Sequence, residues 1–311
     1  MNREIVLRCA GHPVARYLTR PDLATDQAPR PYLHPVTTLA GVPVTDVLPA
    51  DHPHHLGAGV AVADVAGHNF WGGRTFVRGQ GPTVLANHGV QRHDGFARRE
   101  PDGFVERLSW TAADRVLLRE VRTVAVVPLS GTAWALDLTF ALTNVSGAGL
   151  SVGSPATNGR PGAAYGGFFW RAPRTATAPA VFGPDADGEE QVHGSVRDWV
   201  ALAGEGWTLV FAGATEETRR DPWFVRAAEY PGVGSSLAHH RRLPVEAGGT
   251  AVRRVVTVVT DGRLDRAEAA ALVRTAVGTA VRTPVLGAVR TAAHETVRTP
   301  VRQTVRTGGV G

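Results

Sequence analysis

The clearest hydrophobic pattern in the chain is an alternation over residues 134–143. Successive side chains of a β-strand point to opposite faces, so a period of two predicts a long strand with one buried face. Its expected partner is the apolar run at 114–129, joined to it by a turn at Ser130-Gly131. The apolar members of the alternation are Trp134, Leu136, Leu138, Phe140 and Leu142.

Other runs of strand length are separated by glycine and proline, which end strands and form turns. Residues 21–31 are polar and proline-rich and predict a loop, and the glycine-rich stretch 72–82 predicts a hairpin or a binding loop. Strands this long with short connections favour an all-β fold, a large antiparallel β-sandwich. The further strand-like runs are 3–9, 14–19, 32–39, 42–48, 56–65, 103–128, 196–202, 207–212, 222–229 and 251–260.

One helix is expected, near the end of this β-rich region. Residues 264–273 have helical composition, with Asp265 as N-cap and Glu268 three residues later. Val-Arg-Thr then recurs every eight residues from Val273, with Pro284 and Pro300 inside the repeat. We therefore expect one β-sandwich domain over 1–272 and a low-complexity, mostly disordered arginine-rich tail over 273–311.

Composition limits the classes of function. The chain has 311 residues, 43% of them hydrophobic, and its basic residues are all arginine. The tail's six arginines and one glutamate account for the net charge of +5, so the domain has no net charge and we expect no nucleic-acid binding by it. Cys9 is the one cysteine, and no segment has the length and apolarity of a signal peptide or a membrane span, so we expect a soluble, cytoplasmic protein.

Candidate chemistry is concentrated at residues 51–96, which hold six of the twelve histidines. Read as a strand, this stretch would place His52 and His54 on one face and His55 on the other, although Pro53 favours an edge or an irregular start. Three interpretations stay open: a metal site completed by Asp64 or Asp94, contacts to a sugar or other polar ligand, or a structural histidine cluster. His88, Arg92 and His93 follow and suit hydroxyl or anion recognition and acid–base chemistry, or else form a polar hairpin loop.

A second candidate segment is the glycine- and proline-rich stretch 153–173. It contains Tyr165, Trp170 and Arg171, and we expect a loop this rich in aromatic residues to cover another part of the protein or a ligand. Its aromatic rings, with Trp71, could stack on a sugar face or could fill the core. Glu229 is a candidate base or an ion-pair partner of Arg226.

Three segments together resemble the bacterial PmoA-like family, labelled "methane oxygenase PmoA". They are residues 52–71, the run Ala164–Arg171 and the run PWFVRAAEYPGV at 222–233. The resemblance covers most of 1–272 and none of the tail. The family label by itself implies no particular chemistry for a chain without a membrane span.

A second resemblance is to the aldose epimerases, which are galactose-mutarotase-like proteins. Asn87–Arg92 is similar to their HGxxR segment, and residues 138–154 are similar to a long strand ending in "TN-S". It implies an antiparallel super-sandwich with a sugar site, in which His88 and Arg92 contact the sugar and Glu229 lies near the catalytic base. The chain departs from that pattern where the second histidine would stand, at Ala156-Thr157-Asn158.

We therefore expect a protein that binds a carbohydrate or polyhydroxy metabolite, or an enzyme that modifies a sugar by acid–base chemistry of the epimerase or lyase type. The sequence identifies no cofactor. The alternatives are a metal-dependent oxidoreductase using His52, His54 and a carboxylate, and a non-catalytic binding module. The expected catalytic residues are His88 and Glu229. The expected ligand contacts are His54, His55, Arg92, His93, Tyr165, Trp170 and Arg171.

Overall fold

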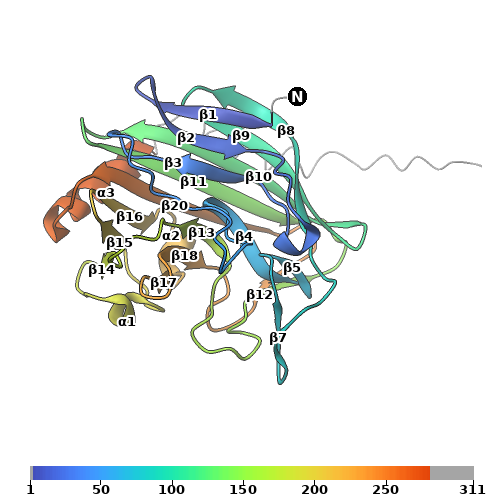
Figure 1. Cartoon of the computed structure of the whole chain (residues 1–311). Helices are drawn as coiled ribbons and strands as arrows, with labels where there is room; N and C mark the ends of the chain where they lie inside the picture. The colour runs from blue at the N-terminus through green and yellow to red at the C-terminus, as the bar shows by residue number, and fades with distance from the viewer. Residues whose placement is uncertain (1–2, 281–311) are drawn as a thin grey trace, which may run out of the picture.

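The structure is a computed structural model that describes residues 3–280 of the chain. Two large antiparallel sheets pack face to face, as Figure 1 shows, and the predicted all-β sandwich is confirmed. The eight-stranded sheet has the order β14 (Ala180–Phe182), β15 (Trp199–Gly204), β16 (Trp207–Gly213), β20 (Thr250–Asp261), β11 (Ala133–Asn144), β10 (Arg115–Pro128), β9 (Gly103–Ala112) and β8 (Val90–Glu100).

The second sheet has ten strands within the described residues. Its main order is β1 (Glu4–Cys9), β2 (His12–Leu18), β3 (Tyr32–Val36), β4 (Ala58–Val65), β13 (Gly167–Arg171), β18 (Gly232–Ser236) and β17 (Trp223–Arg226). Beside this path, β5 (His68–Phe70) and β12 (Leu150–Gly153) pair with β4, and β19 (Leu243–Val245) pairs with β12. A separate hairpin joins β6 (Thr75–Val77) to β7 (Gly81–Thr83), as the glycine-rich stretch predicts.

The predicted central hairpin is confirmed. β10 pairs with β11 in register from Leu118–Asn144 to Pro128–Trp134, across the turn at 130–131. The apolar side chains of the alternation enter the main core between the sheets. The opposite face of β11 is buried as well, because Ala135 packs against α3 (Arg266–Ala280). The prediction of one buried face was therefore incomplete.

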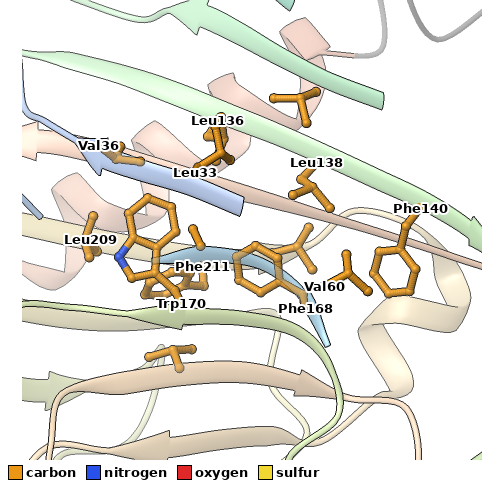
Figure 2. Packing of buried hydrophobic residues seen from close by; sticks show 14 of the residues in the cluster. Leu33, Val36, Val60, Leu136, Leu138, Phe140, Phe168, Trp170, Leu209 and Phe211 are labelled. Atoms are coloured by element: carbon orange, nitrogen blue, oxygen red, sulfur yellow. The ribbon is translucent and has the colours of Figure 1, made fainter. Parts of the chain in front are cut away.

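Strand β13 differs most from the sequence prediction. Residues 167–171 were expected to belong to a loop, yet they form a strand between β4 and β18. Figure 2 shows Phe168 and Trp170 among core side chains from both sheets, such as Val60 of the ten-stranded sheet and Leu138 of the eight-stranded sheet. The strand alternates, so Phe169 and Arg171 point to the outer face of the ten-stranded sheet.

Short helices complete the described part of the chain. They are the 3₁₀ turn η1 (Thr25–Gln27), α1 (Glu189–Val192) and α2 (Glu216–Arg220). The predicted cap of α3 is confirmed, because Asp265 Oδ1 accepts the Glu268 N–H at 2.8 Å and Glu268 Oε2 accepts the Asp265 N–H at 2.8 Å. The helix continues beyond its predicted end at Val273 to Ala280, so residues 274–280 are helical rather than part of a disordered tail. The rest of the predicted tail, 281–311, lies outside the described residues.

Candidate ligand-binding site

A second hydrophobic cluster lies on the outer face of the ten-stranded sheet, away from the main core. Ala61 and Ala63 of β4 contribute small side chains to it, while Phe169 of β13 and Phe224 of β17 contribute rings. Small residues on β4 leave space above the sheet, which larger aromatic side chains enter from loops. The loop residues of the cluster are Trp71, Tyr165 and Tyr230.

A cavity of about 430 Å³ opens above this cluster, and we call it the histidine pocket. Five separated parts of the chain form it, and its volume suits a ligand of the size of a small sugar or metabolite. Its lining combines aromatic rings with histidine, arginine and carboxylate groups. The lining residues are Asp51, His52, Pro53, His54, His55, Trp71, Gly72, Gly73, Arg74, Pro82, Arg160, Ala163, Tyr165, Phe224, Arg226, Glu229 and Tyr230.

The three histidines gather because residues 51–55 form a turn, not a strand. The His55 N–H donates to the His52 carbonyl at 2.9 Å, which brings the rings of residues three apart together. The His52 and His55 rings stack with centroids 4.6 Å apart, and the His54 ring meets His55 edge-on at 4.9 Å. The predicted separation of His55 from His52 on opposite strand faces is therefore wrong, because the chain turns at Pro53.

Two buried arginines lie close to these rings. Arg30 donates to the carbonyl groups of Gln27, Ala28 and His54 at 2.8–3.0 Å. Arg171 is fully buried, its Nη1 lies 3.4 Å from His55 Nδ1, and its guanidinium covers the Tyr230 ring at 4.6 Å. The Nε and Nη2 atoms of Arg171 have no hydrogen-bond partner among residues 3–280.

The buried histidines are held in the neutral form. Burial, reinforced by the charge of Arg30, lowers the pKa of His54 from 6.5 to about 3. Burial also lowers the pKa of His55, with further contributions from His54, His52 and Arg171. Each neutral ring offers one N–H donor and one acceptor nitrogen, which suits hydroxyl groups.

His52 is the most exposed of the three and has a carboxylate partner. Its Nδ1 lies 3.2 Å from Asp51 Oδ2, and Arg174 donates to the same Asp51 oxygen at 3.0 Å. Burial by itself raises the pKa of Asp51, but the contact with His52 and the charges of His52 and Arg174 lower it overall. Asp51 is therefore an ionised carboxylate beside the imidazole of His52.

A glycine turn forms the part of the pocket wall that lies against His54. Gly72 and Gly73 have φ of +102° and +67°, and a Cβ at Gly73 would lie 2.8 Å from the His54 ring. Asn69 fixes the turn, since its Oδ1 accepts the N–H groups of Trp71 and Gly72 at 2.8 and 2.9 Å. Larger side chains at the two glycines would push the loop off the histidines.

Comparison with known proteins places the chain in a family. The model of a family of unknown function, DUF6807, matches residues 4–274. The chain belongs to this family. No curated protein matches this DUF6807 member. Among solved structures, heparinase III is similar at 10% sequence identity and a TM-score of 0.23, over 59% of this chain and 22% of that one. A likeness this slight has no bearing on the activity of the DUF6807 chain.

Of the predicted site residues, four line the histidine pocket: His54, His55, Tyr165 and Glu229. Arg171 lies beneath the pocket against His55. Trp170 was wrongly predicted to stack on a ligand, because it is fully buried in the main core and its Nε1 donates to the Val44 carbonyl at 2.8 Å. The alternation of β13 separates these two neighbours.

The predicted contacts from residues 88–93 lie outside the pocket lining. His88 Nε2 is 2.7 Å from the Gly73 carbonyl, so it supports the glycine turn from behind. Arg92 is exposed on β8 and pairs with Asp94 at 3.2 Å. His93 Nδ1 lies 2.5 Å from the buried carboxylate of Glu106. The predicted ligand contacts of Arg92 and His93 are wrong, because β8 is an edge strand of the other sheet.

The sequence reading missed Arg74, Arg160, Arg226, Phe224 and Tyr230 as pocket residues. For two of them a signal was present. In β17, Trp223 and Val225 enter the main core, so alternation directs Phe224 and Arg226 outward. The others sit on loops, which have no such periodicity.

The carboxylates expected to complete a metal site are engaged elsewhere. Asp64 accepts from Arg242 at 2.8 Å and from Asn158 at 3.0 Å, and Asp94 accepts from Arg119 at 2.9 Å. Within the described range 3–280, no three His, Cys, Asp or Glu side chains are arranged to hold a metal ion. None of the helices in that range is long and apolar enough to cross a membrane.

A larger cavity of about 830 Å³ lies elsewhere, beside α2 and β19. It includes His239, His240 and Arg241, but two of its charged side chains already pair with each other. Arg253 binds Asp221 through two contacts of 2.5 and 3.2 Å. The histidine pocket is therefore the stronger candidate for a ligand site.

Proposed function

We propose that this chain binds a carbohydrate or a related polyhydroxy metabolite in the histidine pocket. The observation that carries the proposal is the pocket's lining, an aromatic floor beneath polar walls. Sugar rings present C–H groups on one face, which pack on aromatic rings, and hydroxyl groups at the edge, which need donors and acceptors. Trp71, Tyr165, Phe224 and Tyr230 suit the first need.

The polar walls suit the second need. His52 and His54 supply imidazole groups, Arg226 supplies a guanidinium donor, and Glu229 supplies an exposed carboxylate. Together they offer both donors and acceptors to a polyhydroxy ligand, as small-molecule sites require. A cytoplasmic location belongs to the same proposal, and the free, buried Cys9 fits a reducing compartment.

A second candidate function is acid–base catalysis on the bound sugar. The distance of 3.2 Å between Asp51 Oδ2 and His52 Nδ1 favours it, because histidine close to a carboxylate is a common general acid or base. His52 takes the place of His88, whose Nε2 is occupied by the Gly73 carbonyl. Glu229, which also lines the pocket, supplies a second carboxylate for proton transfer. A non-catalytic module would show affinity for the same sugars without turnover.

The test is a thermal-unfolding screen of the full chain against hexoses and pentoses, both neutral and anionic. A ligand at a hundred times its dissociation constant adds about 2.7 kcal/mol to the free energy of unfolding. His52→Ala should abolish the shift, whereas His12→Ala, at an exposed histidine in the β1–β2 hairpin, should leave it unchanged. The proposal fails if no sugar stabilises the protein, or if both variants respond like the wild type.

A further inference from the structure

The histidine pocket contains more positive charge than its carboxylates can balance. Arg74, Arg160 and Arg226 line it, against Asp51 and Glu229. Asp51 also accepts a hydrogen bond at 3.0 Å from Arg174, which lies outside the pocket lining. Arg226 lies 3.6 Å from Glu189 and 3.9 Å from Glu229, so these three charges form a local group of their own.

Arg74 and Arg160 are the uncommitted charges. Both are exposed at the pocket, and neither has an ion-pair partner among residues 3–280. Both line cavities together with Tyr165: Arg160 in the histidine pocket, and Arg74 both there and in a small adjoining void. Tyr165 in turn packs on Trp71 with ring centroids 4.5 Å apart. Two guanidinium groups that form no ion pair among residues 3–280 therefore line the pocket together with Tyr165.

The buried arginines add to this field. Arg30 is buried and has no ion-pair partner in the described part of the chain, and the nearest carboxylate oxygens to Arg171 are 3.9 Å away, on Asp46 and Asp51. Charges in a low-dielectric wall are screened less than exposed charges, so they attract an anion into the cavity. Burial lowers the pKa of His54 and of His55, and the positive charge of the nearby arginines adds to this effect.

We propose that the ligand is an anionic sugar whose carboxylate or phosphate group is held by Arg74 and Arg160. This inference rests on the proposed sugar-binding function and specifies its substrate class. Guanidinium groups bind both anions through paired N–H donors, so the arginines would act as specificity-determining residues. The aromatic floor would carry the sugar ring while the arginines select its charge.

Isothermal titration calorimetry of the full chain tests this with matched ligands. D-Glucuronate and D-glucose 6-phosphate are compared with D-glucose, and the galacto and manno series are treated in the same way. The variants are Arg74→Gln and Arg160→Gln, with Arg263→Gln as control, since Arg263 is exposed and outside the pocket. Each titration is run at low and at moderate salt.

We expect at least one anionic sugar to bind at least about fivefold more tightly than its neutral counterpart. Each pocket variant should lower the affinity for that anionic sugar by about fivefold. The pocket variants should bind neutral sugars as the wild type does, and Arg263→Gln should leave the affinity for every sugar unchanged. Salt should weaken the binding of the anionic sugars alone. A preference for uronates or for phosphates identifies the anion. Equal affinity for neutral and anionic sugars, or unchanged anion affinity in both pocket variants, overturns the inference and leaves sugar binding intact. If none of the sugars binds, both proposals fail.

Discussion

Replacing Arg122 with methionine should strongly destabilise the sandwich, because this residue joins the two sheets beneath the candidate site. Arg122 is fully buried on β10, and its Nε and Nη2 donate to Glu120 at 2.7 and 2.9 Å. It also donates to Tyr17 Oη at 3.1 Å and to Gln91 Oε1 at 3.0 Å. Gln91 then donates to the carbonyl of Val60 on β4, and β4 contributes Ala61 and Ala63 to the hydrophobic cluster on the outer face of the sheet.

The magnitude follows from what the substitution leaves behind. Arg122→Met keeps Glu120 buried with only the Trp110 indole N–H, at 2.8 Å, as a donor. Breaking a buried ion pair by removing one partner costs about 3–5 kcal/mol. Removing Glu120 as well takes away the stranded charge, so Arg122→Met/Glu120→Met should cost less than Arg122→Met alone.

Urea unfolding followed by far-UV circular dichroism measures both variants and the single Glu120→Met variant. We expect the double variant to be more stable than the sum of the single effects predicts, by at least about 2 kcal/mol of coupling. A single Arg122→Met effect below about 1 kcal/mol, or strictly additive effects, would refute the reasoning, because the network would then not be a coupled, buried one.

Three further predictions concern single residues. Asp265→Ala should lower the free energy of unfolding by about 1 kcal/mol through loss of the α3 cap, measured by the same denaturation, and Asp265→Asn should lose less. Trp170→Phe should cost about 1–2 kcal/mol through loss of its hydrogen bond to Val44 and leave ligand affinity unchanged, and a selective loss of affinity in titration calorimetry would contradict its core role. His54 has a folded-state pKa of about 3 against 6.5 unfolded, so the unfolded state binds more protons between these values. Stability should therefore fall as pH drops from 6.5 towards 3, by about 2–4 kcal/mol from this residue, and a His54→Gln variant with the same pH profile would contradict this.

Local patterns predicted those elements whose signal is continuous in sequence. The alternation over 134–143 identified β11, and Asp265 with Glu268 identified the start of α3. Strand β13 was missed because its five residues follow a glycine- and proline-rich segment and show no polar–apolar alternation. Such a strand is apolar on both faces, since one face meets the main core and the other meets the pocket floor.

The sequence predicted only part of the candidate site, because only part of it has a local sequence signal. The density of histidines at 52–55 marked one wall, but the turn at Pro53 that gathers their rings has no periodic signature. The side chains of Arg92 and His93 suit ligand binding, but they lie outside the histidine pocket, and His93 contacts Glu106 on the next strand instead. Arg74 and Arg160 line the same pocket although they are far apart in the sequence, and no local pattern encodes such a long-range arrangement.

The measurement that tests the central claim most directly is a histidine-ring NMR titration of the full chain with the sugars described above. Saturating ligand should shift the resonances of His52, His54 and His55, which line the pocket, while His12 stays unchanged. No shift at these three rings, or shifts confined to His239 and His240 in the larger cavity, would contradict the assignment of the histidine pocket as the ligand site.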